Sequence, residues 1–130
     1  MNDNVLHQRV SPLIHNEYKD LAPMIHRQRM VIEGYPESSM SAEEIKTYLR
    51  QLSGILDMKV LCEPVTHQSP KYGWAGWIHW ETSGAHFYAW DEPLLFFSVD
   101  IYTCKEFSEQ RALDYTGAFF NASELSSRQF

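Results

Sequence analysis

The strongest constraint on the fold is a change in hydrophobic period near residue 57. Between residues 41 and 56, apolar residues recur at helical spacing, which is typical of a helix with one buried face. Ser41-Ala-Glu-Glu44 at the start is a capping-box pattern and predicts where that helix begins. After Asp57 the alternation becomes that of strands. The apolar helix positions are Ile45, Tyr48, Leu49, Leu52, Ile55 and Leu56.

Five segments have the composition of strands, because they are rich in β-branched and aromatic residues and are bounded by turn residues. They are residues 28–35, 58–66, 73–82, 84–90 and 94–103. A second helix is predicted over residues 107–121, where apolar residues again repeat at helical intervals. The order strand, helix, several strands, helix predicts an α+β two-layer sandwich. It consists of an antiparallel sheet of four or five strands with two helices packed on one face.

The two ends of the chain differ from this pattern. Residues 1–25 are polar and punctuated by prolines, so we expect an N-terminal extension with at most a short helix, outside the sheet. Residues 26–122 form the predicted domain, and residues 123–130 are expected to be a flexible polar tail. The first residues lack the features of a signal peptide, and the chain has two cysteines, expected as reduced thiols. A cytoplasmic protein is therefore expected.

The charge balance restricts the possible partners. The net charge is −6, which gives no electrostatic footprint for nucleic acid or for an anionic membrane surface. We therefore expect a small-molecule substrate or ligand, no nucleic acid and no membrane. A cationic ligand fits the acidic balance, although a charge of this size commonly serves only solubility.

Individual residues with chemical potential carry little by themselves. His79 and Glu81 share a strand face, but two ligands without a third do not make a metal site, so no metal is expected. An isolated Cys104 is typical of a small hydrophobic residue. Ser83, within Glu81-Thr-Ser-Gly-Ala85, is typical of a turn between two strands.

The order and spacing of these residues are more informative than any one of them alone. Ser83 is followed by Trp90-Asp-Glu92 and then by Val99-Asp-Ile-Tyr-Thr-Cys104. This succession resembles the bacterial and archaeal S-adenosylmethionine decarboxylases, and the resemblance runs from about residue 26 to residue 121. The positions that match the family's motifs are His67, Gly73, Gly76, Ser83, Trp90, Glu92, Asp100, Thr103 and Cys104.

The resemblance implies a pyruvoyl-dependent decarboxylase of polyamine (spermidine) biosynthesis. In that family the serine matching Ser83 attacks the preceding carbonyl, the chain cleaves itself autocatalytically, and a pyruvoyl group forms from the serine. Thr82 would end the first fragment. Cys104 matches the residue that returns a proton to the substrate, and Glu92 matches the acid that holds the ribose. The resemblance also implies a homodimer.

Four functional positions depart from the family pattern. Ala75 replaces a serine thought to assist processing, and Tyr88 replaces a catalytic histidine. Thr82 replaces the glutamate before the cleavage serine, and Ser69 replaces the phenylalanine that stacks on adenine. A phenol, with its ordinary pKa of about 10, is a much poorer base near neutrality than an imidazole.

Three readings therefore remain open. The first is a decarboxylase acting on S-adenosylmethionine or a related cationic amino acid, with Ser83, Cys104 and Tyr88 catalytic. The second is a non-processing paralogue that acts as a small-molecule-binding or regulatory homodimer, and the third is a homodimer without a retained site. In the first, the substrate-binding residues are Glu92, Trp90, His67 and Ser69.

We also expect Ser83, Cys104, Tyr88 and Glu92 to converge on one pocket near the turn at Gly84. The open face of the sheet, with its Trp and Tyr side chains, is expected to pair in the homodimer.

Overall fold

The computed structural model describes residues 11–130 of the chain. In chain order its elements are β1 (Gln28–Tyr35), α2 (Ala42–Ile55), β2 (Val65–Ser69), β3 (Gly73–Trp80), β4 (Ser83–Trp90), β5 (Phe96–Thr103), α3 (Glu109–Phe119) and β6 (Glu124–Gln129).

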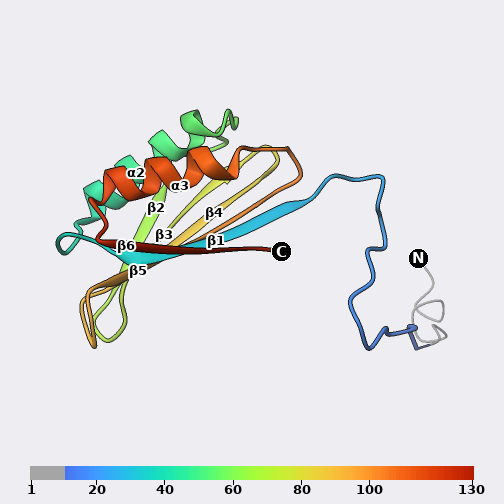
Figure 1. Cartoon of the computed structure of the whole chain (residues 1–130), viewed down its shortest axis with the longest axis horizontal. Helices are drawn as coiled ribbons and strands as arrows, with labels where there is room; N and C mark the ends of the chain where they lie inside the picture. Colours follow the sequence, from blue (N-terminus) through green and yellow to red (C-terminus); the bar gives the residue numbers. More distant parts are fainter. Residues whose placement is uncertain (1–10) are drawn as a thin grey trace, which may run out of the picture.

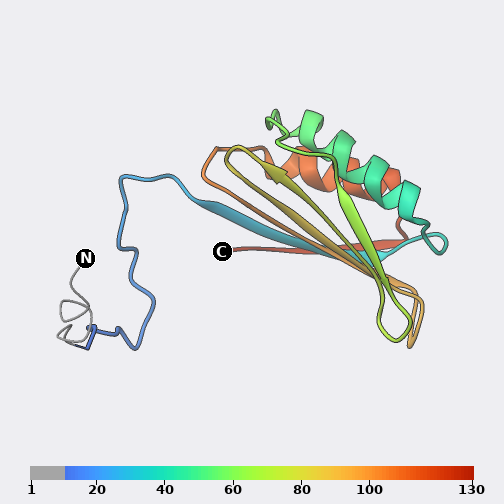
Figure 2. The same ribbon diagram turned by 180° about the vertical axis from the view of Figure 1, so that it is seen from behind.

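The described strands form one six-stranded sheet in the order β2-β3-β4-β5-β1-β6, and every neighbouring pair is antiparallel. Both helices lie against the same face of this sheet, and the opposite face carries no helix of the described part (Figures 1 and 2). The predicted α+β two-layer sandwich is confirmed. We call the uncovered side of the sheet the open face.

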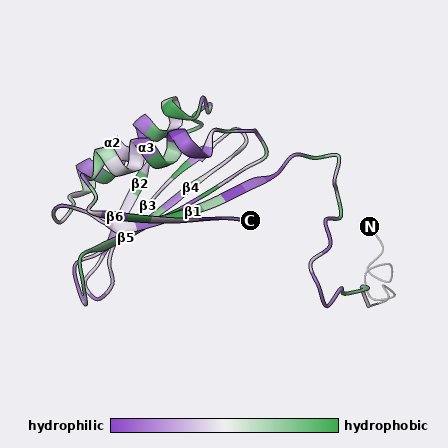
Figure 3. Cartoon of the chain, in the orientation of Figure 1, coloured by the Kyte–Doolittle hydropathy of each residue, from purple (hydrophilic) through white to green (hydrophobic). Residues whose placement is uncertain are grey.

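The helix α2 begins as its capping residues predict. The hydroxyl of Ser41 accepts a hydrogen bond from the backbone N–H of Glu44, and the Glu44 carboxylate accepts one from the Ser41 backbone. Hydrophilic and hydrophobic residues intermix along both helices (Figure 3), and the apolar side is buried against the sheet. Within this core Tyr48 is fully buried, and burial raises its pKa, so the phenol stays neutral while it hydrogen-bonds Thr116 at 2.8 Å.

The sequence-based boundaries were wrong in two places. Residues 124–129 form β6, paired with β1, where a flexible tail was expected. Gly34 allows this pairing, because a Cβ there would collide with the backbone of Glu124 and the side chain of Leu125. Within the expected strand 58–66, Val60 makes only an isolated bridge and the regular strand starts at Val65.

The described part of the extension contributes no strand to the sheet. Residues 11–27 contain turns and bends but no helix, and residues 1–10 lie outside the described part. We call residues 11–27 the arm. In both views the arm runs from the start of β1 away from the sheet (Figures 1 and 2).

The two faces of the sheet can be followed along β4. Ala85, Phe87 and Ala89 are buried against the helices. The alternating His86 and Tyr88 are exposed on the open face, because side chains of successive strand residues point to opposite sides. This alternation determines which residues can meet at a functional site.

Candidate functional site

Ser83 is the first residue of β4 and follows a two-residue turn, since it pairs with Trp80 in β3. It also pairs with Thr103 in β5. The φ angle of Ser83 is 139°, a region that side-chain-bearing residues rarely adopt. Such a conformation costs on the order of 1–3 kcal/mol and persists only where the surroundings enforce it.

The peptide bond before Ser83 is held by β5. The carbonyl oxygen of Thr82 accepts a hydrogen bond of 3.0 Å from the backbone N–H of Cys104. The Thr103 hydroxyl donates to the Thr82 hydroxyl at 2.9 Å and accepts from the backbone N–H of Lys105 at 3.0 Å. Thr82, Ser83 and Cys104 are therefore neighbours, although about twenty residues of sequence separate them.

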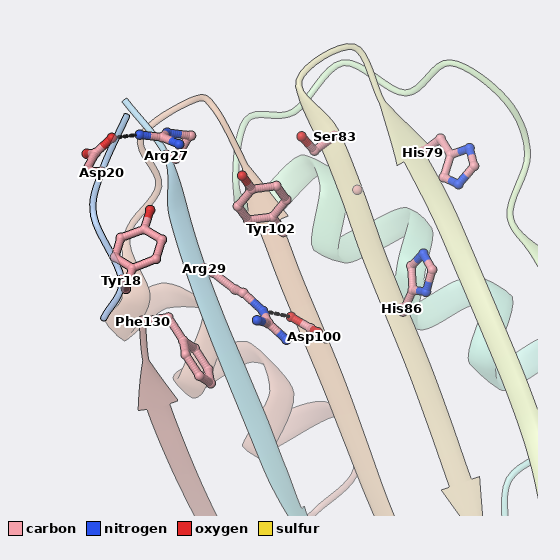
Figure 4. A pocket seen from close by; sticks show the side chains of 11 residues that line it. Tyr18, Asp20, Arg27, Arg29, His79, Ser83, His86, Asp100, Tyr102 and Phe130 are labelled. Carbon is pink, nitrogen blue, oxygen red and sulfur yellow. Dashed lines mark hydrogen bonds and ion pairs between the residues drawn. The ribbon is translucent and has the colours of Figure 1, made fainter. Parts of the chain in front are cut away.

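A cavity of about 1020 Å³ adjoins Ser83 on the open face. Its wall comes from the arm, from β1 and from strands β3 to β5, and the side chains turn toward the same hollow, away from the helices (Figure 4). The residues that line it are Tyr18, Asp20, Arg27, Arg29, His79, Ser83, Gly84, His86, Asp100, Tyr102 and Phe130.

The charges in this cavity are paired. Arg29 donates to both carboxylate oxygens of Asp100, at 3.0 and 2.8 Å, and its guanidinium lies 4.5 Å from the centre of the Phe130 ring. Arg27 forms an ion pair with Asp20 in the arm. The rings of His79 and His86 stack with centroids 6.5 Å apart. With both carboxylates paired, the lining has no excess of negative charge at neutral pH.

Tyr88 lies farther along the same face. It is directly opposite Ala75 in β3, and Ala75 is in turn opposite His67 in β2. At about 3.3 Å per strand residue, Tyr88 is about 17 Å from Ser83. Ala75 and Tyr88, at which the expected processing side chains are replaced, are therefore cross-strand neighbours, and both lie away from Ser83.

The other end of the open face is aromatic. The Trp90 ring lies 5.4 Å from Phe96 and 6.1 Å from Tyr88, measured between centroids, and Tyr35 lies 6.4 Å from Phe96. We call Tyr35, Tyr88, Trp90 and Phe96 the aromatic cluster. Glu92 lies two residues after Trp90 and is exposed.

Ser69 is close to this end but is used locally. Its hydroxyl accepts hydrogen bonds from the backbone N–H groups of Lys71 and Tyr72, at 3.2 and 3.1 Å, and so closes the turn between β2 and β3. The role of Ser69 in substrate binding remains a prediction, because its hydroxyl is already engaged.

The expected convergence of four residues on one pocket is wrong for a single chain. Ser83 and Cys104 lie together, whereas Tyr88 lies in the middle of the sheet and Glu92 beyond its far end. The reason is geometric: β4 runs straight from Ser83 to Trp90, so residues of one strand cannot gather at one point.

Sequence reasoning also missed several side chains of the cavity, among them Arg29, His86 and Tyr102. The alternation of side chains along a strand could have identified them, because every second residue lies on the same face. His86 shares the face of Tyr88, and the pairing of β4 with β5 brings Asp100 and Tyr102 to the same side. The register between strands distant in sequence, such as β1 and β5, is not predicted by any local pattern in the sequence.

No cluster of three metal-binding side chains occurs among residues 11–130. No helix within the same range combines the length and the apolar character needed to cross a membrane.

Comparisons with known proteins agree with this architecture. The model of the S-adenosylmethionine decarboxylase family matches residues 31–130, which is most of the chain. The chain belongs to the S-adenosylmethionine decarboxylase family. Members of this family depend on a pyruvoyl group.

Among solved structures, the fold is similar to that of the adenosylmethionine decarboxylase from Aquifex aeolicus, with a TM-score of 0.68. The sequences are 19% identical, and the match covers 82% of this chain and 89% of the Aquifex chain. No curated protein matches the sequence. The family match begins inside β1, so the arm precedes it.

Proposed function

We propose that this chain is a pyruvoyl-dependent decarboxylase that forms its own prosthetic group from Ser83. The observation that carries the proposal is the environment of the Thr82–Ser83 peptide bond. The Cys104 N–H contacts the Thr82 carbonyl oxygen, and Ser83 has a strained backbone. These features are what self-cleavage at a serine needs.

In the first step the Ser83 hydroxyl oxygen attacks the carbonyl carbon of Thr82. Negative charge develops on the Thr82 oxygen, where the Cys104 N–H stabilises it. The C–N bond then breaks, and the hydroxyl proton ends on the Ser83 nitrogen, which leaves an ester between Thr82 and the Ser83 side chain. Breaking the peptide bond also releases the backbone strain at Ser83.

In the second step a base removes the Cα proton of Ser83, and the Cβ–Oγ bond breaks. Thr82 leaves as a carboxylate that ends an 82-residue fragment. The new N-terminus of the 48-residue fragment takes up water and releases ammonia to become a pyruvoyl group. This step needs a base, and it is the step at which Tyr88 replaces the family's histidine.

The site around Ser83 fits such a group. Ser83 is exposed toward the cavity, and Cys104 is exposed beside it with a free thiol. When formed, the pyruvoyl group supplies an electron sink for the loss of a carboxylate. Cys104 would then return a proton to the substrate carbon.

In a homodimer, the open faces of two sheets would stack on each other. If the two-fold axis lies between the sheets and perpendicular to their strands, the Ser83 end of one copy faces the Glu92 end of the other. Each of two sites would then combine Ser83 and Cys104 of one copy with Tyr88 and Glu92 of its partner. The exposed aromatic residues of this face support such pairing.

The substrate we propose is S-adenosylmethionine or a related cationic amino acid, as in polyamine biosynthesis. The aromatic cluster offers rings for stacking on a base, a contact worth about 1–3 kcal/mol per base. It could replace the stacking side chain absent at Ser69. Glu92 beside it is placed to bind hydroxyl groups or a cation.

The alternative is a non-processing paralogue that acts as a small-molecule-binding or regulatory homodimer. Ala75 and Tyr88 favour it, because both processing side chains are absent together.

Intact mass spectrometry of the purified chain distinguishes the two. Loss of one general acid or base typically lowers a rate by about 10²–10⁴-fold. We therefore expect fresh protein to be mainly the uncut 15.2 kDa chain, with fragments of 82 and 48 residues accumulating slowly. Ser83→Ala should give none.

Tyr88→His combined with Ala75→Ser should speed cleavage by about 10²-fold or more. The matched control is Tyr35→His, a tyrosine equally exposed on the same face, which should have no effect. Complete cleavage of the fresh unmodified protein would refute our account of Tyr88, but it would strengthen the proposal that the chain is an enzyme. No cleavage even in the double variant would overturn the proposal in favour of the paralogue.

A further inference from the structure

The elimination step of the proposed self-cleavage has no efficient base at position 88. Tyr88 stands there in place of the histidine that the resemblance implies, and a phenol is a poor base near neutral pH. The cavity beside Ser83 nevertheless contains two imidazole rings, those of His79 and His86 (Figure 4). The self-cleavage proposed for Ser83 so far uses neither of them. The cavity thus holds the kind of side chain that position 88 lacks.

The other proton acceptors among the lining residues are paired or weak. The two carboxylates, Asp20 and Asp100, each form an ion pair with an arginine. Tyr18 and Tyr102 carry phenol groups, which are poor bases near neutrality. An imidazole is the side chain best suited to take a proton at neutral pH. Among the lining residues, one of the two histidines is therefore the best candidate for the base.

The strand register separates the two histidines. His79 in β3 is directly opposite Gly84, the residue after Ser83. Its Cα is therefore about 5 Å across the sheet from β4 and one residue, about 3.3 Å, along it from Ser83. His86 is three residues from Ser83 on the same strand, a distance of about 10 Å between the Cα atoms. The ring of His79 can reach the Ser83 Cα, whereas that of His86 falls short of it.

Gly84 leaves the space between His79 and Ser83 open. It has no side chain, and a Cβ there would collide with the backbone of β3, so no larger residue fits. The ring of His79 stacks on that of His86, but His79 is exposed, and exposed side chains change rotamer within nanoseconds. Rotation toward Gly84 brings the imidazole beside Ser83.

We propose that His79 is the base of the elimination step, an inference that rests on the proposed self-cleavage at Ser83. Once the ester has formed, Ser83 is joined to Thr82 only through its side chain, so its Cα can turn into the cavity. An imidazole nitrogen of His79 takes the Cα proton, and the electron pair forms a double bond between Cα and Cβ. The Cβ–Oγ bond breaks, and Thr82 leaves as a carboxylate that keeps the Oγ oxygen. The slow cleavage expected of the unmodified chain is the part that His79 supports.

Hydroxylamine separates the elimination from the step before it. It cleaves esters but not ordinary peptide bonds, so a chain that has formed the ester breaks after Thr82. The 48-residue fragment then begins with an intact Ser83. Elimination instead gives this fragment a pyruvoyl end, which intact mass spectrometry distinguishes. Purified protein is followed over time, and samples are measured with and without brief exposure to hydroxylamine.

His79→Gln should lower the rate of pyruvoyl formation by about 10²-fold, as is typical for the loss of a general base. Its cleavage by hydroxylamine should match that of the unmodified chain, because the ester forms without His79. The matched control is His26→Gln, which should leave both rates unchanged. His26 is exposed at the same end of the sheet, outside the cavity lining, where its ring contacts the Gln28 side chain at 3.3 Å.

His86→Gln tests the choice between the two rings. It should lower the rate of pyruvoyl formation by at most about tenfold, through loss of the ring on which His79 stacks. A larger loss for His86→Gln than for His79→Gln would overturn the assignment.

Added imidazole tests whether the effect is chemical. His79→Ala leaves space at the position, so imidazole in solution should raise its rate of pyruvoyl formation. The side chain of His79→Gln fills that space, and imidazole should have little effect there. An equal response of the two variants would show that His79 acts through packing, and the proposal would be wrong.

The remaining outcomes keep the two proposals apart. If hydroxylamine cleaves no chain and no pyruvoyl fragment appears, the ester never forms and the proposed function of Ser83 fails. If the ester forms but His79→Gln gives the pyruvoyl fragment as fast as the unmodified chain, self-cleavage stands and His79 is not its base. An ester that yields no pyruvoyl fragment in any chain would also overturn the role of His79.

Discussion

The two ends of the open face are built from different kinds of groups. At the Ser83 end, the contacts that matter come largely from the backbone: the Cys104 N–H, the Thr82 carbonyl and the strained φ of Ser83. At the Glu92 end they come from side chains, chiefly the rings of the aromatic cluster.

This difference parallels the positions at which the sequence departs from the expected family pattern. Three of the four departures, Ser69, Ala75 and Tyr88, lie in the middle of the sheet or toward the Glu92 end. A backbone hydrogen bond persists through most substitutions as long as the fold persists, whereas a side-chain function is lost in one change. In the proposed self-cleavage, attack by Ser83 would therefore be the better preserved step, whereas elimination and substrate binding would depend on the replaced side chains.

The largest expected effect comes from separating the two ends onto different chains. Under the proposed function, Ser83→Ala would prevent the pyruvoyl group from forming, and Glu92→Gln removes the carboxylate at the other end, so each variant should be inactive in decarboxylation. When the two are mixed and refolded together, a heterodimer would contain one intact site. Activity should return to about a quarter of that of the unmodified protein, measured as release of labelled carbon dioxide.

The matched control mixes Ser83→Ala with Cys104→Ser. Both residues lie at the same end, so no combination of these chains restores a complete site. If the first mixture stays as inactive as the second, the two ends do not meet in a dimer and the shared site is refuted.

The sequence predicted those features that depend on local periodicity. The helix from Ser41, the alternation in β4 and the order of elements all follow from spacing within about fifteen residues. The family resemblance placed Ser83 and Cys104 together, and the structure has them adjacent. The separation of Tyr88 and Glu92 from Ser83 followed from strand geometry, but only once the limits of β4 were known.

Other features depended on pairings that leave no local signal. Residues 124–129 read as a polar tail because β6 lies at the sheet edge, where only Leu125 is partly buried. The cavity arises from the register of β1 with β5 and from the path of the arm, which no periodicity encodes.

A second prediction compares the contributions of the two faces to stability where they adjoin in β4. Phe87 is fully buried among aromatic rings of the core, so Phe87→Ala should lower the free energy of unfolding by about 3–5 kcal/mol. Tyr88→Ala, one residue away on the open face, should change it by about 0.5 kcal/mol or less in the monomer. Urea denaturation at low protein concentration measures both. A large loss for Tyr88→Ala would mean that the aromatic cluster serves the fold and not a ligand.

The smallest expected effect tests the strain at Ser83. Ser83→Gly and Ser83→Ala both remove the hydroxyl, so the difference between them isolates the Cβ atom at a φ of 139°. Relief of about 1–3 kcal/mol of strain should outweigh the greater entropy that glycine loses on folding, about 0.5–1 kcal/mol. The glycine variant should therefore be the more stable by about 1 kcal/mol in urea denaturation.

Ser98, within β5 and opposite Tyr88, provides the control, because no left-handed backbone angle occurs there. At that position the order should reverse, with Ser98→Ala more stable than Ser98→Gly. The same order at both positions would show that Ser83 stores no strain, and the case for a primed peptide bond would then rest on the Cys104 N–H alone.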